Sequence, residues 1–207
     1  MGALQEDLLN EIKILYEKRR EDIEKRIDEF KKEKNKEEIL AELIFCIFTP
    51  QSKAKYCWCA AKNILEKNLV CEEEIRKEIS RIRFKNKKAK YVLNAMKNFD
   101  RIFENIKGME GEEAREYLVK NIKGMGYKEA SHFLRNIGIG LNLAILDRHI
   151  LKNLKNLGVI DEIPSHLSRK KYLEIEEKMK KFSEEISIPM SHLDLLLWCK
   201  ATGEVFK

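Results

Sequence analysis

Lys128 and Asp147, in the second half of the chain, are the residues with the clearest potential for chemistry. A neutral lysine amine is a nucleophile toward carbon, and a fixed carboxylate stabilises positive charge that develops during a reaction. The two positions are separated by 19 residues, enough for one helix and one turn to bring the chain back. Each also has an ordinary structural explanation. Lys128 could be a solvated surface lysine, and Asp147 could be a helix N-cap that contributes about 1 kcal/mol of stability.

Two glycines, Gly124 and Gly126, flank Met125 just before Lys128 and separate two expected helices. Glycine lets the backbone approach a ligand closely because it has no Cβ. The second helix begins by Tyr127, and its first turn presents unpaired N–H groups and partial positive charge, so a phosphate fits there. The pattern indicates a helix-hairpin-helix element. The alternative is a glycine helix stop followed by an ordinary helix.

Helix geometry predicts where the two candidate side chains lie. Lys128 is about 200° around the helix from the apolar Ala130, at ~100° per residue. We therefore expect it to face away from the core, on the side of His132 and Arg135. Asp147 opens the next helix, and a carboxylate that caps a helix is held rigidly, so capping and catalysis are compatible.

Apolar residues recur at helical spacing almost throughout, without alternating strand runs, so the predicted fold class is all-α. The expected helices cover residues 4–32, 37–48, 53–67, 71–82, 87–98, 112–121, a segment from 127, a segment from 147, 168–185 and 190–202. The turn at residues 49–52 ends the second of these, and Ser52 is expected to cap the third. We expect two lobes, one of residues 37–112 and one of residues 1–36 with 113–207, with the first helix beside the last ones.

Composition sets limits on the class of protein. With 43% apolar residues the chain is expected to be globular, and its net charge of +6 suits contact with phosphate without establishing it. The five cysteines match no zinc or iron–sulfur spacing, so we expect free thiols. No signal peptide or membrane span is predicted, and the expected location is the cytoplasm.

The frame Gly124–Ala130 followed by Leu146–His149 resembles the hairpin, lysine and aspartate of the helix-hairpin-helix DNA glycosylase superfamily. The tail, residues 193–207, is similar to the closing segment of the type-2 8-oxoguanine DNA glycosylases, and residues 126–135 and 163–176 also look like that family. Endonuclease III carries a four-cysteine iron–sulfur loop after the hairpin. Only Cys199 lies beyond it here, so that cluster cannot form.

The resemblance implies a two-lobed helical fold with an active-site cleft between the lobes. It also implies a bifunctional enzyme that flips 8-oxoguanine out of the duplex and attacks the sugar with Lys128. An imine and then β-elimination follow, and Asp147 stabilises positive charge on the sugar. The implied partner is double-stranded DNA containing oxidised guanine, the protein is expected to be a monomer, and no cofactor or metal is expected.

The resemblance also suggests substrate-binding residues near the chain end. Lys207 matches a terminal lysine that helps to tell 8-oxoguanine from guanine in that family; otherwise it is a frayed terminus. Trp198 either stacks on the flipped base or anchors the last helix in the core. Met190 and Asp194 open that helix and are expected to line the pocket.

Two further residues are candidates for insertion into DNA. Gln51 sits in the turn where relatives insert a residue into the gap left by the base; the alternative is a polar turn residue. Phe84 lies in the basic loop of residues 81–88, where an aromatic ring among phosphate-seeking charges could wedge into the base stack. The alternative for Phe84 is a place in the core.

Three other functions are compatible with parts of this pattern. One is a DNA-binding module that uses the hairpin without catalysis. Another is a bifunctional glycosylase for oxidised pyrimidines, which the missing cysteine cluster and the Lys207 ending disfavour. The third is a helical interaction protein in which the charges form only a solvated surface.

Overall fold

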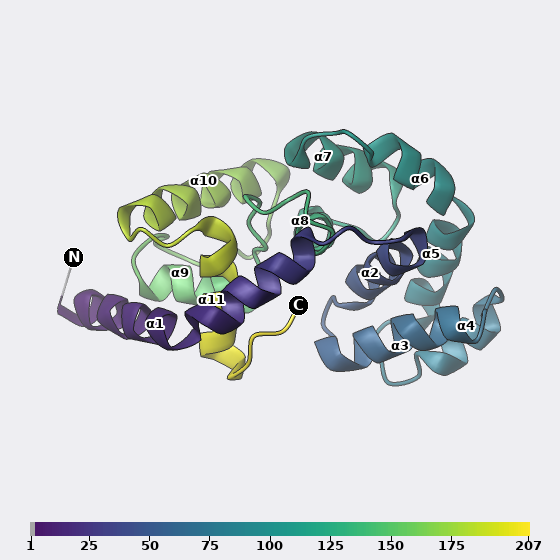
Figure 1. Cartoon of the computed structure of the whole chain (residues 1–207), viewed down its shortest axis with the longest axis horizontal. Coiled ribbons are helices and arrows are strands. Elements are labelled where there is room, and N and C mark those ends of the chain that lie inside the picture. The colour runs from purple at the N-terminus through teal and green to yellow at the C-terminus, as the bar shows by residue number, and fades with distance from the viewer. Residues whose placement is uncertain (1–2) are drawn as a thin grey trace. The chain divides into compact units, whose positions relative to one another are not determined.

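The computed structural model describes residues 3–207, and this part of the chain is all-helical, as predicted (Figure 1). Its helices are α1 Ala3–Lys31, α2 Lys36–Phe48, α3 Ala54–Glu66, α4 Glu72–Glu78, α5 Lys85–Lys97, α6 Phe99–Ile106, α7 Gly111–Asn121, α8 Tyr127–Asn136, α9 Arg148–Asn156, α10 Arg169–Glu185 and α11 Met190–Thr202. They form two compact units. The central unit is Lys32–Gly140, and the terminal unit combines α1 with Leu141–Lys207.

Helix α2 forms the core of the central unit and packs against α3, α5 and α8. It begins with a capping box, because Asn35 Oδ1 accepts from the Glu38 N–H at 2.9 Å and Glu38 Oε2 accepts from the Asn35 N–H at 2.8 Å. From Ala41 to Phe48 every α2 residue is buried. The helix is therefore a fixed base for the turn at residues 49–52 that follows it.

Helices α7 and α8 also belong to the central unit, so the boundary expected near residue 112 lies inside it. The reason is packing: α8 contacts both α2 and α7, and α7 contacts α6. A buried hydrogen bond from Asn136 Nδ2 to Glu42 Oε2, 2.9 Å long, joins α8 to α2. Burial makes such a bond costly to lose, so it fixes the orientation of α8.

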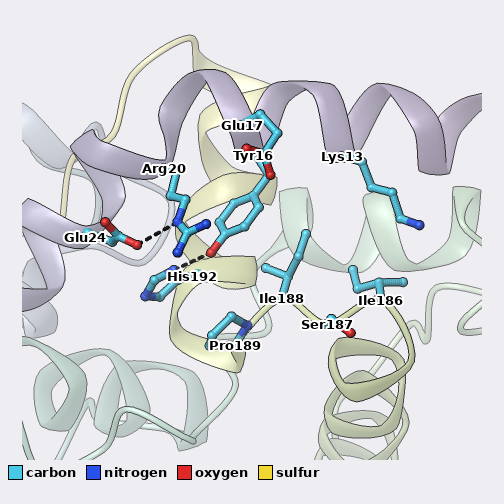
Figure 2. Close-up of a pocket in the computed structure, with 10 residues that line it drawn as sticks. All are labelled: Lys13, Tyr16, Glu17, Arg20, Glu24, Ile186, Ser187, Ile188, Pro189 and His192. Carbon is cyan, nitrogen blue, oxygen red and sulfur yellow. Dashed lines mark hydrogen bonds and ion pairs between the residues drawn. The ribbon is translucent and has the colours of Figure 1, made fainter.

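Helix α11 is the centre of the terminal unit and packs against α1, α9 and α10. The expected packing of the first helix beside the last is therefore confirmed within this unit. A pocket of about 460 Å³ lies in this unit. It is lined by side chains of α1 and by Ile186–Pro189 and His192 (Figure 2). Tyr16 Oη lies 2.9 Å from His192 Nδ1, and burial raises the pKa of Tyr16 and lowers that of His192. Residues expected to bind the base do not line this cavity.

Three local predictions were wrong. Helix α6 was missed because only Asn98 separates it from α5, with no glycine or proline to mark its start. Helix α4 ends at Glu78, several residues earlier than expected. Lys53, and not Ser52, occupies the N-cap position of α3, which lacks a side-chain cap, because the Ser52 hydroxyl bonds elsewhere. No helix within residues 3–207 combines the length and apolar character needed to cross a lipid bilayer.

Candidate active site

The predicted hairpin joins α7 to α8, and its two glycines differ. Gly124 has φ +86°, and a Cβ at this position would lie 2.3 Å from Cδ2 of Tyr91. Both the left-handed backbone and the close ring therefore require glycine there. Gly126 is the N-cap of α8 with an extended backbone, and its N–H donates to Glu129 Oε2 at 3.2 Å. Met125, between them, is buried and anchors the turn.

Lys128 lies in the first turn of α8, and its side chain is only 19% exposed. Its Nζ donates to Thr49 Oγ1 at 3.2 Å and lies 3.9 Å from Glu129 Oε1. Thr49 is the C-cap of α2, and its own hydroxyl donates to the Cys46 carbonyl at 2.9 Å. The amine is therefore held in a largely buried position by a contact from the end of α2. Sequence reasoning did not identify Thr49.

The side of α8 that carries Lys128 does not point away from the core, so that prediction was wrong. His132 and Arg135, on the same side, are 6% and 3% exposed. The His132 ring packs edge-on against Phe45 of α2, with 5.3 Å between ring centroids. Because α8 is enclosed by α2 and α7, only its first turn leaves a polar side chain partly accessible.

Asp147 caps α9, as predicted. Its Oδ1 accepts from the His149 N–H at 2.8 Å and from the Ile150 N–H at 2.9 Å. Both bonds use one oxygen, so Oδ2 accepts no hydrogen bond from the residues that the structure describes. The carboxylate is half-buried and locally fixed, with one oxygen available to a ligand.

Helix α10 positions the segment that leads into Asp147. The Tyr172 hydroxyl donates to the Ala144 carbonyl at 2.6 Å and accepts from the Leu146 N–H at 3.3 Å. Glu176 Oε2 accepts from the Ala144 N–H at 2.8 Å. These buried bonds hold the extended segment against α10, so the start of α9 has a defined position within the terminal unit.

The chain end folds onto α11. Trp198 is half-buried, and its ring lies 6.4 Å from that of Phe206 between centroids. Lys207 is also half-buried. Met190 and Asp194, near the start of α11, are 7% and 4% exposed.

The two candidate DNA-inserting residues share an unusual backbone. Gln51 has φ +53° and Phe84 has φ +59°, the left-handed region that side chains other than glycine rarely adopt. Both are exposed, Phe84 by 52%, so a core position for Phe84 is wrong. The Arg83 guanidinium lies 5.4 Å from the centroid of the Phe84 ring. Strained, exposed residues of this kind concentrate at functional sites.

Lys88 was counted among the phosphate-seeking charges of the 81–88 loop, but it is only 4% exposed. Its Nζ donates to the carbonyls of Phe48 and Pro50, both at 2.7 Å, and to Ser52 Oγ at 3.1 Å. The pKa of Lys88 is lowered to about 8, mainly by burial and in smaller part by the charge of Lys128. Burial also raises the pKa of the Cys57 thiol, which donates to the Phe48 carbonyl at 3.3 Å, to about 11.

Comparison with known proteins agrees with this arrangement. The family model described as 8-oxoguanine DNA glycosylase, Ogg-HhH, matches residues 23–188. An 8-oxoguanine DNA glycosylase/AP lyase of Fusobacterium nucleatum is 46% identical, with 97% of this chain and 98% of that protein aligned. The protein of the same name from Methanocaldococcus jannaschii is 44% identical, with 89% of this chain and 91% of that protein aligned.

Solved structures give the same result for the fold. The M. jannaschii 8-oxoguanine glycosylase/lyase in complex with a 15mer DNA containing 8-oxoguanine matches with a TM-score of 0.89 and 42% identity, covering 97% of this chain and 99% of that chain. The 8-oxoguanine DNA glycosylase of Thermotoga maritima also gives 0.89, at 36% identity, covering 98% of this chain and 100% of that chain. The fold is thus that of a helix-hairpin-helix DNA glycosylase. The chain belongs to the 8-oxoguanine DNA glycosylase family.

Proposed function

We propose that this protein is a bifunctional DNA glycosylase/AP lyase that removes 8-oxoguanine from double-stranded DNA and then cleaves the strand. The observation that carries the proposal is Lys128, held largely buried in the first turn after the hairpin in a chain of this family. Its full-length similarity to proteins named for both activities supports the same conclusion. The protein acts as a monomer on its DNA substrate.

The reaction begins with extrusion of the damaged nucleotide, because a base inside a duplex cannot be reached by a protein nucleophile. The neutral Lys128 amine attacks C1′ of the sugar, and the N-glycosidic bond breaks with its electron pair leaving on the base, which takes up a proton. Ring opening converts the sugar–lysine adduct into an imine. Loss of a proton from C2′ then expels the 3′ phosphate, and water hydrolyses the imine to restore the amine.

Asp147 supplies negative charge where the sugar becomes cationic as the glycosidic bond breaks. Its two hydrogen bonds from the α9 backbone support this role, because a carboxylate that is already oriented needs little reorganisation during the reaction. The remaining oxygen, Oδ2, is the group we assign to the sugar.

The chain end provides recognition of the base. We assign stacking on the flipped base to Trp198 and polar contacts that distinguish 8-oxoguanine from guanine to Lys207. Met190 and Asp194 complete the pocket. The half-buried positions of Trp198 and Lys207, and the ring contact of Trp198 with Phe206, support an ordered chain end in this role.

DNA binding uses the hairpin and two exposed turns. We assign the binding of a backbone phosphate to the hairpin turn that contains Gly124 and Gly126 and to the start of α8. Gln51 fills the gap left by the extruded base, and Phe84 wedges into the neighbouring base stack. Their exposure and left-handed backbone support these assignments.

Borohydride trapping tests the proposal, because it reduces the imine to a stable protein–DNA adduct. With a duplex containing one 8-oxoguanine we expect an adduct, and we expect none with undamaged duplex or with Lys128→Gln. A duplex containing an oxidised pyrimidine tests the rival substrate class. Failure to trap an adduct with any oxidised base, or an undiminished adduct with Lys128→Gln, contradicts the proposal.

A further inference from the structure

The end of α2 lacks a cation of its own, and Lys88 of α5 provides one. The last carbonyls of a helix have no partner within the helix and carry partial negative charge. No basic residue occupies the last turn of α2, and Pro50 has no N–H to donate. The buried Lys88 ammonium instead donates to the carbonyls of Phe48 and Pro50, both at 2.7 Å.

The third hydrogen bond of Lys88 links two turns that are far apart in sequence. Lys88 Nζ donates to Ser52 Oγ at 3.1 Å, and the same oxygen accepts from the backbone N–H of Arg83 at 3.2 Å. The turn at residues 49–52 carries Gln51, and Arg83 directly precedes Phe84. One buried ammonium therefore connects the segments that carry Gln51 and Phe84, two of the four residues other than glycine with positive φ in the described part of the chain.

The same turn also reaches Lys128. Thr49, at its start, accepts the hydrogen bond from Lys128 Nζ at 3.2 Å. Phe48 and Pro50, whose carbonyls Lys88 binds, are its immediate neighbours. A shift of the turn would move Thr49, Gln51 and the loop before Phe84 together.

We propose that Lys88 is a positioning residue for the reaction: it fixes the end of α2 and the turn at residues 49–52, and thereby sets the places of Thr49, Gln51 and Phe84. Lys88 itself does not touch the substrate, because its ammonium is buried and directed at three protein acceptors. The expected effect on excision rests on the proposed function, whereas the expected effect on the order of the turn does not depend on it.

The test compares Lys88→Met with Lys90→Met, an exposed lysine of the same helix, at a temperature where both are fully folded. Amide hydrogen exchange should become faster at Ser52 and Arg83 in Lys88→Met only, because both amides belong to the network. Single-turnover excision of 8-oxoguanine should fall about 10- to 100-fold, the scale of a misplacement near 1 Å. Lys90→Met should match wild type in both measurements.

Further variants separate positioning from general stability. Lys88→Arg keeps the charge and the donors and should recover part of the rate. Ser52→Ala removes only the oxygen that Lys88 and Arg83 share. This variant should make amide exchange at Arg83 faster and should slow excision, but by less than Lys88→Met does. It also provides the test if Lys88→Met does not fold. Unchanged exchange, or faster exchange with a wild-type excision rate, overturns the proposal. Absence of activity in wild type refutes the proposed function instead and leaves the exchange result to decide the role of Lys88.

Discussion

The N-terminal ends of α8 and α9 each carry a candidate catalytic side chain, but the two side chains are held in place by different means. Asp147 is fixed by two N–H groups within three residues of it. Lys128 is held by Thr49, 79 positions away in sequence, and the turn containing Thr49 depends on Lys88. The aspartate is thus positioned locally and the lysine by the packing of the central unit. Substitutions should therefore affect the two sites in different ways.

Lys128→Gln should have the largest effect, a loss of at least about a thousandfold in base excision, because no other group takes over the nucleophile's role. The free energy of unfolding should change by about 1 kcal/mol or less, since the amine makes a single hydrogen bond at 3.2 Å. Single-turnover kinetics and urea denaturation check the two values. Retention of more than a tenth of the activity would argue against this role for Lys128.

Asp147→Asn should lower excision about 100-fold or more, because it removes the negative charge that the proposed function assigns to stabilising the cationic sugar. Its stability should change little, since asparagine caps a helix as well as aspartate. Asp147→Ala should lose the cap as well, at a cost of about 1 kcal/mol. Ser168→Ala is the matched control: it removes the cap of α10, which accepts from the Lys171 N–H, and should lose stability without losing activity. Equal activity of Asp147→Asn and wild type would leave Asp147 with a capping role only.

Substitution of Gly124 in the hairpin should reduce stability by backbone strain and by a steric clash, and Gly108 allows the two causes to be separated. Gly108 and Gly124 have nearly the same φ, +83° and +86°, but a Cβ would meet no atom within 4 Å at Gly108 and would lie 2.3 Å from Tyr91 at Gly124. Gly108→Ala should therefore cost about 1–2 kcal/mol from backbone strain alone. Gly124→Ala should cost more and should also weaken DNA binding. Thermal unfolding measures the loss of stability in both variants, and a binding titration measures their affinity for DNA. An equal loss of stability in the two variants would show that the Tyr91 ring moves aside without cost.

A further expected effect, on stability alone, is a pH dependence that comes from Lys88. Burial lowers its pKa from 10.5 to about 8, so between these values the unfolded chain binds more protons than the folded protein. The free energy of unfolding of wild type, relative to Lys88→Met, should therefore rise with pH from about 8 to 10.5 and stay constant below about 7. Urea denaturation of both proteins across this range checks it, since other titrating groups largely cancel in the difference. A difference that stays flat throughout would contradict the burial of the charge.

The same contrast explains what could be predicted from the sequence. Most of the helices, the hairpin and the Asp147 cap follow from apolar spacing, glycine and a capping residue, all of which are local signals. Thr49 and Lys88 could not be found, because their roles depend on partners 36 to 79 positions away. Lys88 looked like one more charge in a basic loop, and Ser52 like a cap. Both were misinterpreted because α5 packs against α2, which no local pattern indicates.

The most direct test of the account is to identify which lysine forms the covalent bond. Burial gives Lys88 a lowered pKa, so on acidity alone it is a rival amine to Lys128. Peptide mass spectrometry of the borohydride-reduced adduct with 8-oxoguanine duplex should find the modification on Lys128, the partly accessible amine at the start of α8. A modification on Lys88, or on any lysine outside the hairpin, would contradict the account.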